Sequence, residues 1–194
     1  MIGGGLHTND FYGVISPENL LRAWLAFSVG KYGNREVACF ELSLEEHVFA
    51  LHEVLARGEW KPDPYVCFRV ADPKPRIIHK ASVRDRVLFQ AVYRELYQIF
   101  DHSFIFDSYA SREGKGTHAG VRRFGVFARK ISMNYTRQAW VCKCDIRKFF
   151  DTIDHNVLLK LITRKIVDTK LINLTKTIID FLRVYLRKVC RLVM

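Results

Sequence analysis

Residues 138–155, QAWVCKCDIRKFFDTIDH, join an apolar, strand-like run to a helix-like run through three aspartates. The pattern predicts a strand followed closely by a helix, with Asp145 at the end of the strand, where its carboxylate can reach into a cleft. Such a carboxylate suits Mg²⁺, which prefers hard oxygen ligands. On spacing alone, a metal ligand and an ordinary strand-end residue are equally good interpretations of Asp145. For Asp151 and Asp154 we favour structural roles, as a turn residue and as a helix N-cap.

The charge balance is strongly basic, because Lys and Arg number 31, Asp and Glu 20, and the net charge is +11. The basic residues are scattered among structured segments rather than gathered on one amphipathic helix, so we expect a polyanionic partner and no membrane. The apolar run at residues 20–30 is short and carries Arg22, which argues against a membrane span and a signal peptide. The five cysteines have no CxxC spacing, and we interpret them as reduced thiols in a cytoplasmic protein.

Periodicity predicts a mixed α/β (α+β) chain, rich in helix, with a small antiparallel sheet. The predicted helices cover residues 18–29, 43–58 (with Gly58 closing the helix), 82–100, 117–133, 155–166 and 171–182. The predicted strands form a hairpin within residues 65–81, around a turn at 72–75, and a further strand at 138–145. Helix starts are assigned from Ser16-Pro17, from a capping box of Ser43 and Glu46, and from Thr117. Residues 31–36, KYGNRE, are expected to separate the first two helices.

Five basic side chains follow one another on the predicted hairpin and the helix after it: Lys74, Arg76, Lys80, Arg84 and Arg86. A β-ribbon beside a helix N-terminus forms a plausible cradle for phosphate groups. A solvated charged face is the alternative, and it is the better account of Lys80 or Arg84 taken singly. The segment REGKG at 112–116 adds Lys115, although its glycines fit no dinucleotide or P-loop pattern. We predict nucleic-acid contacts for Arg84, Arg86 and Lys115.

Three segments together resemble bacterial reverse transcriptases of the group II intron, retron and diversity-generating types. CDIRKFFDTIDH is similar to their first catalytic motif, DPKPRIIHKASVRDRVLFQAV to their fingers hairpin and following helix, and FDSYASREGKGTHAGVRRF to the segment that joins fingers to palm. The likeness runs from about Glu18 to Ile166 with the motifs in order. The diversity-generating type looks closest, and a group II intron-like or phage-defence enzyme is nearly as close.

The resemblance implies a role for each matching residue. Asp145 matches the first metal-binding aspartate, and Ile146 offers its backbone carbonyl to the metal. Phe150 matches the bulky side chain beneath the sugar of the incoming nucleotide, which excludes a 2′-hydroxyl; a core aromatic is the alternative. Arg76 matches the arginine that grips the triphosphate, and Lys74 is a weaker match to the same task.

The implied reaction is attack of a primer 3′-hydroxyl on the α-phosphate of a dNTP, directed by an RNA template. The primer is DNA or RNA, and two Mg²⁺ ions are expected in the complete enzyme, with Mn²⁺ as an alternative. We expect the chain to comprise N-terminal helices and fingers at residues 1–140 and a partial palm at 141–194.

The chain departs from the family because it contains no Asp-Asp pair, no glycine-rich segment after the first motif and no thumb. The metal site is therefore incomplete, and we expect the chain by itself not to polymerise. An incomplete palm exposes a sheet edge and apolar surface, so self-association is expected. The competing hypotheses are a non-catalytic nucleic-acid-binding remnant and, ranked last, a nuclease built on Asp145 and Asp151.

Overall fold

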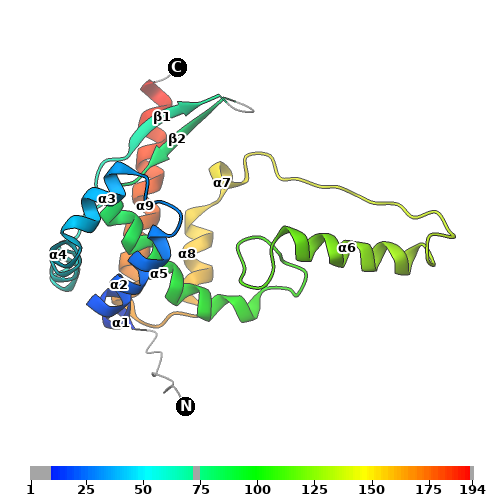
Figure 1. Ribbon diagram of the computed structural model, residues 1–194, viewed down its shortest axis with the longest axis horizontal. Coiled ribbons are helices and arrows are strands. Elements are labelled where there is room, and N and C mark those ends of the chain that lie inside the picture. The colour runs from blue at the N-terminus through cyan, green and yellow to red at the C-terminus, as the bar shows by residue number, and fades with distance from the viewer. Residues whose placement is uncertain (1–9, 72–74, 193–194) are drawn as a thin grey trace, which may run out of the picture. The chain divides into compact units, whose positions relative to one another are not determined.

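The computed structural model describes residues 10–71 and 75–192, without the side chains of residues 150, 151 and 182–192. These residues divide into two compact units, Met1–Leu96 with Asp154–Met194, and Tyr97–Ile153. The described residues are mostly helical and hold one sheet of two antiparallel strands (Figure 1), which confirms the predicted fold class. The predicted boundary between residues 140 and 141 falls inside the second unit, and the division into fingers and palm remains a prediction.

Capping residues start the N-terminal helices of the first unit. The Asp10 carboxylate accepts the Gly13 N–H at 2.7 Å at the start of α1 (Phe11–Ile15). Ser16 accepts the Asn19 N–H at 3.2 Å and begins α2 (Pro17–Ser28), which confirms the start predicted from Ser16-Pro17. Figure 1 shows α1 and α2 beside α4 (Leu44–Ala56). Their apolar faces form the core together: Val14, Ile15, Leu20, Ala23, Trp24, Val48, Leu51 and Leu55.

A further helix, α3 (Arg35–Leu42), was missed because the predicted break at residues 31–36 ends earlier than expected. Asn34 is its N-cap and accepts the Glu36 N–H at 3.1 Å. The capping-box prediction for Ser43 was wrong, because its side chain makes no cap hydrogen bond. Ser43 also ends α3 by donating its backbone N–H to the Glu41 carbonyl, so one residue closes a helix and opens the next.

The hairpin and the helix after it match the sequence prediction closely. Strands β1 (Val66–Val70) and β2 (Arg76–Lys80) pair antiparallel, with Val70 opposite Arg76 and Val66 opposite Lys80. Helix α5 (Val83–Phe100) buries an apolar stripe that consists of Val83, Val87, Leu88, Ala91 and Val92. Asp85 is buried within the same stripe.

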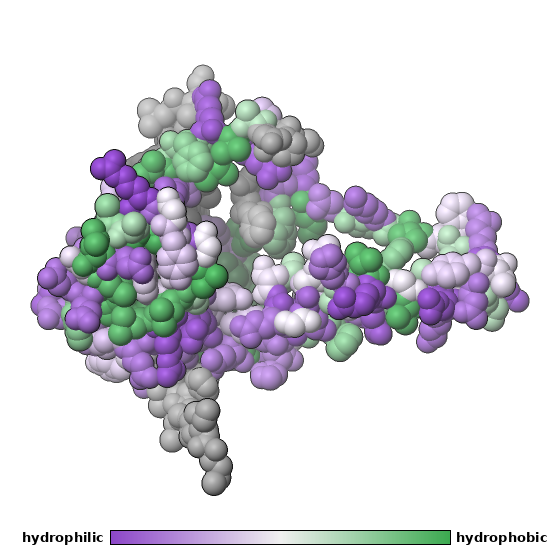
Figure 2. All heavy atoms as spheres, in the orientation of Figure 1, coloured by the Kyte–Doolittle hydropathy of each residue, from purple (hydrophilic) through white to green (hydrophobic). Residues whose placement is uncertain are grey.

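The second unit contains a loop, the short 3-10 helix η1 (Asp101–Ser103) and helix α6 (Thr117–Ile131). Thr117 is not the cap of α6; Gly116 is, with φ +86°, a conformation that glycine adopts without steric cost. No residue of α6 is buried. In Figure 2, hydrophobic and hydrophilic side chains alternate over the segment that carries α6. The apolar residues of this helix are therefore open to solvent, with Val121 and Ile131 each 64% exposed.

The predicted strand at 138–145 was wrong, because these residues have no regular secondary structure. Trp140 is 87% exposed and Val141 69% exposed. A strand needs a neighbouring ladder for its backbone hydrogen bonds, and in the described part of the chain only β1 and β2 pair. The apolar residues here alternate as in a strand, but no neighbouring strand in the described part of the chain pairs with them.

Two helices return to the first unit at the end of the chain. Asp154 caps α8 (His155–Thr163) by accepting the Asn156 and Val157 N–H groups, as predicted. Helix α9 (Thr169–Leu192) is longer than expected. The Asp168 carboxylate accepts the N–H groups of Lys170 and Leu171 and also that of Phe11 at 2.8 Å, so one side chain joins α9 to α1. Among the described helices, none has the length and apolar character needed to cross a membrane.

Candidate functional site

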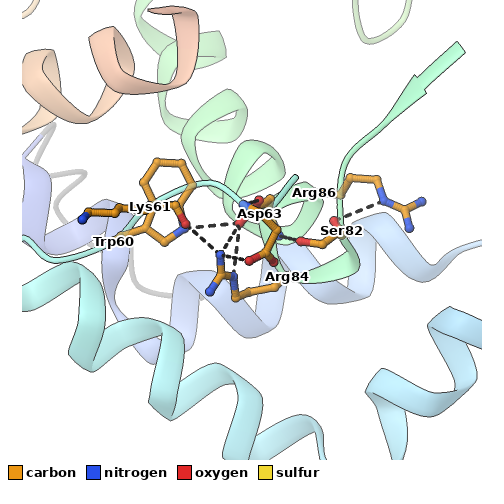
Figure 3. A network of polar contacts seen from close by, with 7 residues as sticks. Trp60, Lys61, Asp63, Ser82, Arg84 and Arg86 are labelled. Atoms are coloured by element: carbon orange, nitrogen blue, oxygen red, sulfur yellow. Dashed lines mark hydrogen bonds and ion pairs between the residues drawn. The ribbon is translucent and has the colours of Figure 1, made fainter. Parts of the chain in front are cut away.

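Arg84 and Asp85, at the start of α5, lie at the centre of a polar network. Figure 3 labels Arg84 together with Trp60, Lys61 and Asp63. Asp85 Oδ1 accepts from Trp60 Nε1 at 3.3 Å, and Oδ2 accepts the Asp63 N–H at 2.6 Å. The Arg84 guanidinium donates to Asp85 at 3.1 Å and to the Lys61 carbonyl at 2.8 Å, and it pairs with Asp63 at 2.8 Å. The segment before β1 is thus fastened to the helix after β2, which holds the base of the hairpin.

Burial governs the electrostatics of this network, because the Asp85 side chain is only 1% exposed. Desolvation raises the pKa of Asp85, although the Asp63 N–H and the Arg84 guanidinium oppose the shift. Burial, reinforced by the Asp85 charge, raises the pKa of Tyr65 to about 12. Sequence reasoning missed Asp85, although a signal existed: it stands three residues before Leu88 and seven before Val92, on the buried face.

Arg86 and Lys80 share one carboxylate, that of Glu36 on α3. Arg86 Nη2 contacts Glu36 Oε1, and Lys80 Nζ lies 3.0 Å from Glu36 Oε2. The Arg86 guanidinium also lies over the Phe27 ring, 5.0 Å from its centroid. Burial alone would raise the pKa of Glu36, but the hydrogen bonds from Lys80 and Arg86 outweigh it and hold that pKa below its usual range. Arg86, which the sequence predicts as a nucleic-acid contact, is thus already paired with a carboxylate of the same chain.

Arg76 lies on the hairpin beside its turn. It opens β2, opposite Val70, and is exposed. This position leaves the guanidinium accessible to an anionic ligand, as a triphosphate contact requires. Lys74, the weaker match to that task, lies outside the described residues.

Lys115 belongs to a loop that Arg112 holds in shape. The Arg112 side chain, 10% exposed, donates to the Asp101 carboxylate at 2.6 Å and to the carbonyls of Ile105 and Ser108 at 3.1 and 3.3 Å. Lys115 Nζ donates to the Phe106 carbonyl at 2.8 Å. Arg112, which sequence reasoning missed as an anchor, therefore gives this loop a defined conformation around the predicted phosphate contact.

Asp145 and Ile146 lie in the irregular segment before the short helix α7 (Phe149–Thr152), and both are exposed. Lys148 adopts φ 51° and ψ 43°, a left-handed turn that redirects the chain into α7. The side chain of Phe150 lies outside the described residues, as does that of Asp151. Asp145 belongs to the second unit and Arg76 to the first.

A carboxylate at Asp145 and a carbonyl at Ile146 are the hard oxygen donors that Mg²⁺ takes, so their chemistry fits the implied ion. They are only two ligands, and the described part of the chain brings together no group of three or more His, Cys, Asp or Glu side chains. Nearby, Cys142 Sγ and Cys144 Sγ are 3.4 Å apart as free thiols. In this conformation Asp145 is accessible to a metal ion without a complete set of protein ligands.

Comparison with known proteins identifies the relationship. Protein YkfC of Escherichia coli (strain K12) is 29% identical over 126 residues, which are 64% of this chain and 32% of YkfC. The uncharacterized 91 kDa protein in cob intron of Schizosaccharomyces pombe is 25% identical over 107 residues, 55% of this chain and 11% of that protein. The chain thus spans a minor part of the length of either relative. The family described as reverse transcriptase (RNA-dependent DNA polymerase) matches residues 61–191, from the Asp85 network through α9, and the chain belongs to that family.

Proposed function

We propose that the chain supplies the fingers and the first catalytic aspartate of an RNA-directed DNA polymerase. The observation that carries this proposal is the family match over residues 61–191, which contains both Arg76 and Asp145. Arg76 on the hairpin would bind the triphosphate of the dNTP, and Phe150 would select the deoxyribose. Asp145 and the Ile146 carbonyl would hold Mg²⁺, which in such sites neutralises charge on the attacking and leaving oxygens.

We further propose that this polypeptide does not polymerise alone. The sequence contains one aspartate in the position of a metal ligand and no Asp-Asp pair, and two-metal catalysis requires more carboxylates than one. The test is primer extension on an RNA template with purified chain, in Mg²⁺ and then in Mn²⁺. We expect no extension. Extension that Asp145→Ala abolishes would contradict this part of the proposal.

Metal binding provides a readout that does not depend on activity. Mn²⁺ titration followed by electron paramagnetic resonance should show weak binding that Asp145→Asn removes. Asp154→Asn is the matched control, because Asn retains the N-cap of α8 and Asp154 is not assigned to the metal. Equal binding by wild type and Asp145→Asn would mean that Asp145 is not a metal ligand.

A non-catalytic nucleic-acid-binding remnant is the second candidate, and the net charge of +11 fits it as well as the first. Both candidates predict salt-sensitive binding to nucleic acid, so only the metal titration separates them. Within the family we propose a group II intron, retron or diversity-generating type. The motifs support this choice, and the name of one relative places that protein in an intron.

A further inference from the structure

Phe106 combines high exposure with two cationic neighbours. Its side chain is 66% exposed, although Lys115 Nζ lies 3.6 Å and the Arg123 guanidinium carbon 5.2 Å from its ring centroid. The same guanidinium lies 4.5 Å from the centroid of Phe127, which is 40% exposed. One loop and the first half of α6 thus place two basic groups around solvent-accessible aromatic rings.

Hydrogen bonds hold both cations in place. Lys115 is tied to the Phe106 carbonyl at 2.8 Å, and Arg123 Nε donates to the Asp107 carboxylate at 2.9 Å. Asp107 also accepts the Tyr109 hydroxyl at 2.8 Å, and these two partners lower the pKa of Asp107, so it stays charged near neutral pH. The cost of ordering these side chains is therefore already met before a ligand binds.

We propose that Phe106, Lys115 and Arg123, here called the Phe106 platform, bind single-stranded nucleic acid. A base stacks on the Phe106 ring or on the Arg123 guanidinium, and the two cations contact the adjoining phosphates. The inference rests on the proposed function, because it assigns the platform to the unpaired template strand.

The chemistry favours a single strand over other occupants. In a duplex the bases stack on one another and their faces are unavailable to a protein ring, whereas a single strand exposes them. Fixed cations beside exposed rings complement phosphates that alternate with bases. An acidic protein segment would pair with the cations, but it would offer no base to stack on the aromatic rings.

The experiment measures fluorescence anisotropy of a labelled 16-nucleotide oligo(U), and of a blunt RNA duplex of equal length, with the full chain at several salt concentrations. Phe106→Ala should weaken oligo(U) binding by roughly tenfold and leave duplex binding unchanged. Phe106→Trp, which retains a stacking ring, should restore affinity. Lys115→Gln should reduce the slope of log affinity against log salt by about 0.7, the value for one phosphate of a single strand. Phe49→Ala on α4 is the control, since Phe49 is 55% exposed and lies outside the platform.

Three results would overturn the inference. The first is an affinity of Phe106→Ala for oligo(U) within twofold of that of wild type. The second is an equal loss of affinity by Phe106→Ala for oligo(U) and for the duplex. The third is that the wild-type chain does not bind oligo(U). The first two results leave the proposed function standing if Asp145 still binds Mn²⁺. If the wild-type chain binds neither RNA, both this inference and the proposed function are wrong.

Discussion

The buried carboxylate of Asp85 is the residue on which the base of the hairpin depends. It accepts hydrogen bonds from Trp60 and from the Asp63 N–H while fully enclosed. Asn at this position has one acceptor oxygen in place of two, so Asp85→Asn leaves a buried donor without a partner. We expect the free energy of unfolding to fall by about 1–3 kcal/mol, measured by urea denaturation. Glu41→Gln, an exposed change on α3, should stay within about 0.5 kcal/mol, and a stability of Asp85→Asn equal to wild type would refute this role.

The contributions of Glu36 and Asp85 to folding stability should depend on pH with opposite signs. The pKa of Glu36 is lowered in the folded state. The contribution of its carboxylate to the free energy of unfolding is therefore complete above the pKa of the unfolded state, and it is lost as the pH falls through the pKa of the folded state. The pKa of Asp85 is raised, so that group favours folding less as the pH rises through the same acidic range. Glu36→Gln should therefore lower the melting temperature at pH 7, through a loss of roughly 0.5–1 kcal/mol.

The check is a thermal melt of wild type and Glu36→Gln at pH 7 and pH 3, where the difference should shrink. Glu18→Gln is the matched control, because Glu18 is 74% exposed in its pair with Arg22 and should have little effect at either pH. A difference that persists unchanged at pH 3 would mean that the charge of Glu36 is not responsible.

Among the elements, α6 carries exposed apolar residues, with Val121 and Ile131 each 64% and Phe124 54% exposed. Exposed apolar side chains on one helix promote association, so we expect α6 to contribute to the self-association predicted from the sequence. Light scattering at high concentration should show masses above the monomer, and Phe124→Gln with Ile131→Gln should reduce them. Phe49→Gln on α4 is the control, and a monodisperse monomeric wild type would contradict the prediction.

The elements also show how far the sequence can predict this fold. Helices with a continuous apolar stripe, such as α2 and α5, were recognisable because their periodicity is local. The eight-residue α3 was missed because it begins within an expected break. The strand predicted at 138–145 was wrong because strand pairing is non-local. An alternating sequence does not show whether a partner strand is present.

The candidate site shows the same limit. Asp145 and Arg76 follow from motifs, whereas the pairing of Glu36 with Lys80 and Arg86 joins positions more than 40 residues apart and has no local signal. Arg84 was expected to touch nucleic acid, but its guanidinium is engaged with Lys61, Asp63 and Asp85. Its position in a basic run gave no indication of these partners.

For the whole molecule, the net charge of +11 makes nucleic-acid affinity dependent on salt. We expect Arg84→Gln to lower stability and leave the salt slope unchanged, because its charge is committed within the chain. Titration of a primer–template against salt, with folding checked by circular dichroism, tests this. A slope reduced by about 0.7–0.9, as for loss of one phosphate contact, would instead restore Arg84 as a nucleic-acid contact.

The hydrogen bond from Phe11 to Asp168 spans 157 positions of the chain. A ribosome makes residues in order, so the first unit cannot close until α9 has emerged, and all of Tyr97–Ile153 is synthesised before that moment. Until then the nascent α1 exposes the surface that α9 will contact. Completion of this unit is thus timed by translation of its last helix.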